Sequence, residues 1–205
     1  MARAEASPGV RRAVVSLALL LQAGCGDTPS ADLLRRSSTA PAPITVGGPA
    51  LLVRSGRQTL VLLPVQQSGS RLLWRGEGGF ALATEGARIV GTAGFGQMLS
   101  AARAEGPDPL EEARALTGRQ ATARRTVDLS GAGREAESMT FGLTLDCSLQ
   151  GEATDGVLLV TERCTGREVA FTNRFWFDAA TGLPLRTEQW VGSEVPALNI
   201  EWRGP

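Results

Sequence analysis

The stretch NRFWFDAATGLPLRTEQW, residues 173–190, predicts a β-hairpin from which the fold of the chain can be worked out. Its aromatic and polar side chains alternate, which is typical of a strand with one buried face. Residues 180–182 can form a three-residue loop with Gly182 in the left-handed conformation. This loop sets a register of matched pairs: Phe177 with Leu185, Trp176 with Arg186, Arg174 with Glu188, Phe175 with Thr187 and Thr172 with Trp190. A slip of one residue would set Phe175 against Arg186.

The predicted register gives the hairpin two faces. The core-facing side carries Phe171, Phe175, Phe177 and Leu185. The other face carries indole, guanidinium and carboxylate groups, namely Arg174, Trp176, Arg186, Glu188 and Trp190. These groups either shield the sheet by stacking on one another or form a platform for a sugar ring or a protein partner. Both interpretations stay open, and the candidate contacts to a partner or glycan are Arg174, Trp176, Arg186 and Trp190.

The chain after Gly48 repeats this strand pattern. Short apolar runs alternate with turn residues, and residues 67–70 and 76–79 predict hairpin loops. Asp108 before Pro109, with Gly118 beyond, predicts a short helix, and a helical turn is expected over Met98–Ala104. The predicted fold class is all-β: a large antiparallel meander sheet curled into a sandwich or partial barrel, with one or two short helices inserted near residues 97–118.

The N-terminal residues predict an exported, lipid-anchored protein. Arg11 and Arg12 precede an apolar run over residues 13–21, which has the length of a signal-peptide core and is too short to span a bilayer as a helix. Residues 23–25, Ala-Gly-Cys, resemble the cleavage site of bacterial lipoproteins, so residues 1–24 are the predicted signal peptide and Cys25 the lipid attachment site. An ordinary cleaved signal is the alternative. Residues 25–48 then form a flexible tether, and residues 49–205 form a single β-rich domain.

The two remaining cysteines, Cys147 and Cys164, lie on neighbouring predicted strands. An exported protein enters an oxidising compartment, where two such thiols can pair. We therefore predict a disulfide between them, with two buried free thiols as the alternative. Two sulfurs are too few ligands for a metal site, and none is predicted.

Composition excludes several classes of function. The chain has 21 basic and 21 acidic residues, so it lacks the positive field that nucleic acid would require. Its lack of His excludes a Ser-His-Asp or Cys-His site. Gly91–Gly96 lacks the spacing and the βαβ setting of a phosphate-binding loop. A carboxylate pair for glycan cleavage stays conceivable among Asp146, Glu152, Asp155, Glu162 and Glu188.

The hairpin over residues 173–190, with ARIVGTAGFG at residues 87–96 and the strand at residues 62–65, resembles the YjbF/GfcB group of lipoproteins encoded with exopolysaccharide and group 4 capsule systems. The likeness extends over most of the mature chain and includes the lipoprotein signal. It implies a periplasmic β-rich fold anchored to the outer membrane, beside a polysaccharide export apparatus with an outer-membrane β-barrel partner. It supplies no catalytic residue and no cofactor.

The expected function is therefore non-enzymatic. A lipoprotein on the periplasmic side of the outer membrane would assist polysaccharide secretion or assembly by binding an export partner or the glycan. The first alternative is a lipid or lipoprotein carrier, because a curled sheet can enclose an apolar cavity. The second is a glycan-cleaving enzyme that uses a carboxylate pair.

Overall fold

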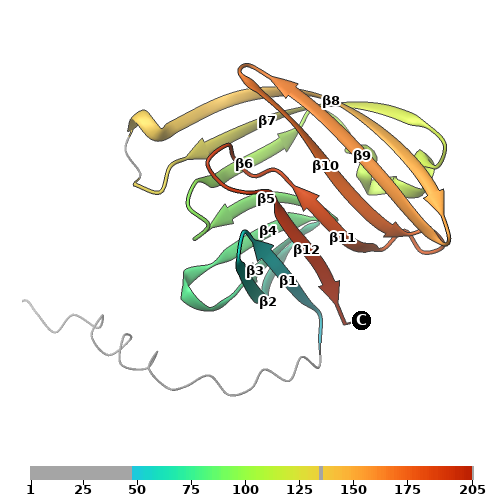
Figure 1. Ribbon diagram of the computed structural model, residues 1–205, viewed down its shortest axis with the longest axis horizontal. Coiled ribbons are helices and arrows are strands. Elements are labelled where there is room, and N and C mark those ends of the chain that lie inside the picture. Colours follow the sequence, from blue (N-terminus) through green and yellow to red (C-terminus); the bar gives the residue numbers. More distant parts are fainter. Residues whose placement is uncertain (1–47, 134–135, 205) are drawn as a thin grey trace, which may run out of the picture. The chain divides into compact units, whose positions relative to one another are not determined.

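A computed structural model describes residues 48–133 and 136–204 of the chain. The predicted signal peptide, Cys25 and all of the tether except Gly48 lie outside the described residues. The described part is dominated by strands (Figure 1), which confirms the all-β prediction. No helix in residues 48–133 or 136–204 is long and apolar enough to cross a membrane.

The described residues form twelve strands and three short 3₁₀ helices. The strands are β1 (Ala50–Ser55), β2 (Gln58–Ser68), β3 (Arg71–Arg75), β4 (Ala81–Glu85), β5 (Arg88–Ala93), β6 (Met98–Ala104), β7 (Gln120–Ser130), β8 (Met139–Thr154), β9 (Val157–Gly166), β10 (Val169–Asp178), β11 (Pro184–Gln189) and β12 (Leu198–Arg203). The helices are η1 (Glu77–Gly79), η2 (Pro109–Leu116) and η3 (Ala136–Ser138).

All twelve strands belong to one antiparallel sheet with the order β5-β4-β3-β2-β1-β12-β11-β10-β9-β8-β7-β6. The sheet curls until its two end strands, β5 and β6, lie against each other, so that it is nearly closed into a barrel. At this seam the described residues form no β-ladder; instead the Leu99 amide donates to the Thr92 hydroxyl over 2.8 Å. A side chain thus joins the two edges where a ladder would otherwise run.

The helical insertion is only partly as predicted. Asp108 caps η2 by accepting a hydrogen bond from the Leu110 amide at 3.0 Å, with Pro109 at the first position. The helical turn expected over Met98–Ala104 is wrong, because this segment is strand β6 paired with β7. Leu99 and Ala102 are buried there, so packing in the sheet outweighs the local helical preference of the segment.

The hairpin register is confirmed at its centre and wrong near its loop. Arg174 faces Glu188, Phe175 faces Thr187 and Trp176 faces Arg186 as predicted. A bulge then places Pro184 opposite Phe177, and Leu185 is exposed instead of buried. The cause is the turn, which Asp178 lengthens by accepting hydrogen bonds from the backbone amides of residues 180 and 181. Gly182 does adopt the predicted positive φ, 75°.

Inward-facing residues form two apolar clusters with polar groups between them. Along β9, Leu158 and Val160 belong to one cluster and Cys164 to the other, and the inward position between them is Glu162. Along β10, Asn173 likewise separates Phe175 from Phe171, which packs on the second cluster. A buried polar layer that contains Glu162 and Asn173 therefore crosses the inside of the sheet between the two apolar clusters.

Candidate functional site

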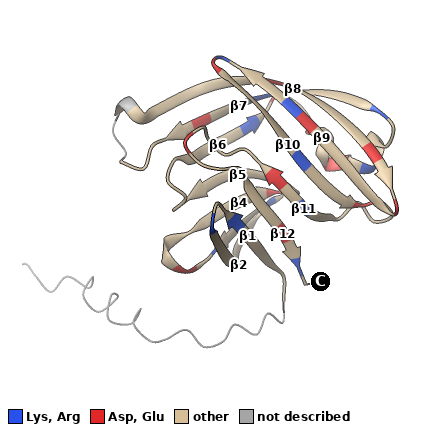
Figure 2. Cartoon of the chain, viewed as in Figure 1, with Lys and Arg blue, Asp and Glu red and all other residues tan. Residues whose placement is uncertain are grey.

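The outer face of β10–β12 carries the predicted platform. The Arg186 guanidinium lies 4.8 Å from the centre of the Trp176 ring and donates to Asn199 on β12 at 3.0 Å. Arg174 and Glu188 form an ion pair at 3.4 Å. Acidic and basic residues are interspersed over these strands (Figure 2), and solvent reaches both members of the ion pair. The face is thus a set of matched pairs with one indole covered by a cation.

Trp190 does not share the outer face with Trp176, although the predicted register placed both there. β11 ends at Gln189, and the Trp190 amide donates to the inward-facing Asn173 side chain at 2.8 Å. Its ring stacks on Phe171 with centroids 4.3 Å apart and packs against the core. The backbone leaves the strand pattern one residue earlier than the alternation suggested. Of the four predicted contact residues, the structure brings together Arg174, Trp176 and Arg186.

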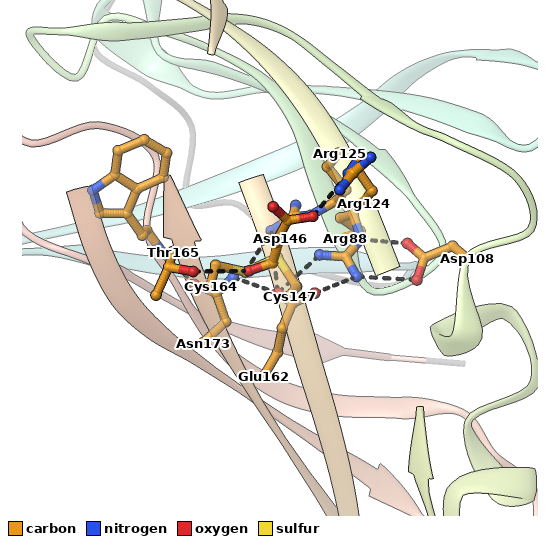
Figure 3. The surroundings of a disulfide bond; sticks show 11 residues. Arg88, Asp108, Arg124, Arg125, Asp146, Cys147, Glu162, Cys164, Thr165 and Asn173 are labelled. Carbon is orange, nitrogen blue, oxygen red and sulfur yellow. Dashed lines mark hydrogen bonds and ion pairs between the residues drawn. A yellow bond between two sulfur atoms is a disulfide. The ribbon is translucent and has the colours of Figure 1, made fainter. Parts of the chain in front are cut away.

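Glu162 is the centre of a second group, on the inner face (Figure 3). Its carboxylate has 0% exposure and accepts hydrogen bonds from Arg88, Arg125 and Asn173, the last at 2.7 Å. These donors come from β5, β7 and β10, so the group joins strands that lie far apart in the sheet order. We call Arg88, Asp108, Arg125, Glu162 and Asn173 the inner charge cluster.

Arg88 uses its whole guanidinium group within this cluster. Its Nη1 and Nη2 donate to Glu162 at 3.1 and 3.0 Å, and its Nε and Nη2 donate to Asp108. Gln189 on β11 holds the start of β5 in place, accepting from the Ile89 amide at 3.0 Å and donating to the Ala87 carbonyl at 2.8 Å. Arg88 is therefore fixed from both sides and serves as the main counter-charge of Glu162.

Arg125 is bonded much less completely. Only its Nη2 makes polar contacts, to Glu162 at 3.2 Å and to the sulfurs of Cys164 and Cys147 at 3.4 and 3.8 Å. Its Nε is buried without any hydrogen-bond partner, and no other buried side-chain nitrogen or oxygen of the described residues shares that state. An unsatisfied buried donor costs about 1–3 kcal/mol, so this arginine calls for an explanation beyond packing.

The pKa shifts follow from these contacts. Burial opposes ionisation of Glu162, but the charges of Arg88 and Arg125 and the hydrogen bonds from Arg88 and Asn173 outweigh it and lower the pKa of that carboxyl. The pKa of Asp108 is lowered too, because Arg88 offsets its burial. Burial and the neighbouring charge of Arg88 lower the pKa of Arg125 to about 10. Arg125 thus shares Glu162 with Arg88, which bonds that carboxylate more completely.

A pocket of about 620 Å³ lies beside the cluster. Its lining comes from the β4–β5 turn, β5, β6, the start of η2 and β7. It includes Glu85, Arg88, Ala104, Asp108, Glu111 and Arg125. The pocket opens at the seam between β5 and β6. Its size is in the range of ligand pockets in proteins.

The disulfide between Cys147 and Cys164 confirms the predicted pairing. The two residues face each other directly on β8 and β9, next to Arg125. Ligand atoms of both cysteines and Glu162 lie within 4.8 Å of one another. Because the sulfurs are bonded to each other, they are not thiolates and do not form a metal site.

Comparison with known proteins identifies the family. The model of the family described as "Group 4 capsule polysaccharide lipoprotein gfcB, YjbF" matches residues 46–202. This chain belongs to the YjbF family. It is also similar in fold to the crystal structure of the hypothetical lipoprotein YmcC from Escherichia coli (K12), with a TM-score of 0.67, 19% identity, and coverage of 88% of this chain and 100% of that one. No curated protein matches.

In this YjbF-family chain the candidate carboxylates do not gather around one site. Glu162 faces inward, whereas Asp146, Glu152 and Glu188 lie on outward-facing positions of β8 and β11. Asp146 and Glu152 are about 20 Å apart along β8 at 3.4 Å per residue. Glu188 lies three strands from β8, or about 14 Å. Asp155 forms the β8–β9 turn with a φ of 51°.

Sequence reasoning missed Arg88, Asp108 and Arg125 as functional candidates in this family member. A signal was present, since Arg125 occupies an inward position between Ala123 and Val127, as Glu162 does between Val160 and Cys164. A charged residue in the core-facing phase of a strand needs a buried partner. The pattern therefore marks these residues, although it does not name their partners.

Proposed function

We propose that this chain is a non-enzymatic accessory lipoprotein that assists secretion or assembly of a capsule or extracellular polysaccharide. It is anchored through lipid on Cys25 to the periplasmic side of the outer membrane, and it binds an export partner, such as an outer-membrane β-barrel protein, or the glycan itself. Membership of a capsule polysaccharide lipoprotein family supports the general setting.

The observation that carries the binding role is the outer face of β10–β12. Trp176, Arg174 and Arg186 stand on a continuous antiparallel ladder, so their positions are fixed before any partner arrives. Arg and Trp are the side chains most often found at the energetic centre of protein interfaces, and both also suit sugars. A partner that displaces the Arg186 guanidinium would stack on the flat ring of Trp176.

The interior favours binding over the two alternatives. Large side chains, among them Leu51, Leu62, Phe175 and Ile200, fill the inward positions of the described strands, which gives a lipid carrier no supporting cavity there. Among the five candidate carboxylates, Glu162 is the one that lies buried within a cluster of charged groups. Its lowered pKa keeps it ionised, whereas a general acid needs a raised pKa.

Gene deletion and complementation test this proposal. Deletion is expected to reduce surface polysaccharide, and the wild-type gene to restore it. The Trp176→Ala, Arg186→Ala double variant should be exported and folded yet restore little surface polysaccharide. The control, Arg124→Ala, changes an exposed arginine on β7 and should restore surface polysaccharide fully. Unchanged polysaccharide on deletion would refute the accessory role. Full restoration by the double variant would refute the platform.

A further inference from the structure

The pocket at the β5–β6 seam differs in its chemistry from the outer face of β10–β12. Elsewhere in the described sheet, neighbouring strands are joined by ladders, but the seam is not, and there the pocket reaches buried charge. Its lining brings together Arg88 and Arg125 from the inner charge cluster (Figure 3) with Asp108 at the start of η2. A gap in the ladder thus gives a ligand access to groups that are otherwise enclosed.

The two arginines differ in a way that indicates a ligand. All three nitrogens of Arg88 donate to carboxylates, so its role is filled by the protein. Arg125 is 5% exposed, donates through Nη2 alone and leaves its Nε without a partner. A guanidinium offers five N–H donors in a planar fork, and a carboxylate accepts two of them side by side. An oxyanion arriving from the pocket would supply the acceptors that Arg125 lacks.

The charges around the pocket restrict which oxyanion fits. A third lining arginine, Arg103, is mostly exposed and paired with Asp128. The carboxylates of Asp108, Glu85 and Glu111 also line the pocket and would repel a ligand with several closely spaced negative charges. The same carboxylates accept hydrogen bonds from hydroxyl groups. A ligand with one negative charge and several hydroxyls therefore matches the lining best. No aromatic side chain lines the pocket, so a neutral sugar would find no ring to stack on.

We propose that this pocket binds one acidic sugar residue, a hexuronate, through its carboxylate at Arg125 and its hydroxyls at Asp108 and Glu111. The inference rests on the proposed role in polysaccharide handling and names the class of glycan involved. Glycans with uronate residues would be held at the seam, while the outer face of β10–β12 remains open to a second partner.

Calorimetric titration of the purified protein tests the site with three probes. These are a tetrasaccharide containing uronate, a neutral glucose tetrasaccharide, and inorganic phosphate, which carries the charge without the sugar. The uronate probe is expected to bind at least ten-fold more tightly than either of the others. Equal binding of the neutral probe would overturn the role of charge. Equal binding of phosphate would overturn the assignment to a sugar.

Variants locate the binding. Arg125→Lys keeps the charge but loses the planar fork, and it should weaken uronate binding at least ten-fold. Ala104→Trp fills the pocket from an exposed position on β6 without changing a charged group, and it should abolish binding. This second variant keeps the test decisive if Arg125→Lys fails to fold. Arg124→Ala, the outward-facing neighbour, is the control and should bind as wild type.

The results also separate this inference from the proposed function. Binding unchanged by Ala104→Trp would place the glycan elsewhere and overturn the site. If no uronate binds but gene deletion still reduces surface polysaccharide, the site is wrong and the accessory role stands. If uronate binds as predicted while deletion has no effect, the site stands and the accessory role is wrong.

Discussion

Both faces of the β9–β11 region carry pairs of arginine and glutamate, which are partly exposed to solvent on the outer face and buried on the inner face. On the outer face, Arg174 and Glu188 form a partly exposed ion pair. On the inner face, Glu162 and Asn173 face each other on β9 and β10 and are buried together with Arg88 and Arg125. Solvent screens the outer pair, whereas burial removes that screening from the inner charges and makes each of them depend on its partners.

This difference shows where function can be changed without affecting the fold. Outer residues can be replaced at little cost in stability, since exposed ion pairs typically contribute about 0.2–1 kcal/mol. Inner charges are costly to desolvate, and an apolar core of the same volume would often be as stable or more so. Their presence is better explained by a requirement for charge at the seam pocket than by stability. The two faces should therefore respond very differently to matched substitutions.

The largest difference is expected for removal of the two acidic residues. Glu162→Ala leaves Arg88 and Arg125 without their shared counter-charge and should lower the free energy of unfolding by about 3–5 kcal/mol. Glu188→Ala, its match on the outer face, should lower it by less than about 1 kcal/mol. Urea unfolding followed by circular dichroism measures both. Equal losses would contradict the contrast between the faces.

Breaking the disulfide should come next in size. Cys147 and Cys164 are 17 residues apart, and a loop of that length corresponds to about 3 kcal/mol of unfolding free energy in the chain-entropy model. The Cys147→Ala, Cys164→Ala variant should therefore unfold at lower urea concentration than wild type. Because the sulfurs also contact Arg125, the variant also removes the support that the disulfide gives to this buried arginine. A loss below about 1 kcal/mol would show that the ladder alone holds β8 to β9.

The two tryptophans of the hairpin form a third matched pair. Trp190 stacks on Phe171 and packs on the core, so Trp190→Ala should cost about 2 kcal/mol, less than a fully buried Trp→Ala change. Trp176→Ala loses mainly the contact with Arg186 and should cost about 0.5–1 kcal/mol. Thermal unfolding of each single variant checks the order. The reverse order would mean that Trp176 belongs to the structural part of the sheet.

Acid should weaken the inner charge cluster. The folded-state pKa values of Glu162 and Asp108 are lowered, so these groups stabilise the protein fully above their unfolded values, near pH 4, and lose that stabilisation as the pH falls further. Each unit of difference contributes about 1.4 kcal/mol. Urea unfolding between pH 7 and pH 3 should show a steeper fall for wild type than for Glu162→Gln, with Glu188→Gln following wild type. Parallel profiles for wild type and Glu162→Gln would contradict the assignment.

The backbone pattern was predictable because its causes are local. Alternation over residues 173–190 determined the central hairpin pairs, and Asp108 before Pro109 predicted the start of η2. The failures also have local causes, such as the longer turn that Asp178 organises and the early end of β11 before Trp190. The bulge at Leu185 absorbs the extra turn residue, so the pairs farther from the loop keep the predicted register.

The inner charge cluster was not predictable in the same way. Arg88 and Glu162 are 74 residues apart, and they meet only because the sheet closes enough to bring β5 inside reach of β9. Alternation on β9 and β7 could mark Glu162 and Arg125 as inward-facing charges. It could not pair them, since pairing depends on the curl of the whole sheet.

The smallest expected effect tests whether the outer face is as loosely coupled as its exposure suggests. In a double-mutant cycle of Arg174→Ala and Glu188→Ala, the coupling free energy should be about 0.2–1 kcal/mol. It should decline in 1 M salt, where the screening length is about 3 Å, similar to the 3.4 Å separation of the pair. The loss caused by Glu162→Ala should persist in that salt, because the ions do not reach its site. A coupling on the outer face that is large and resistant to salt would mean that this face is held rigidly by its own pairs, and a partner would then have to break them before reaching Trp176.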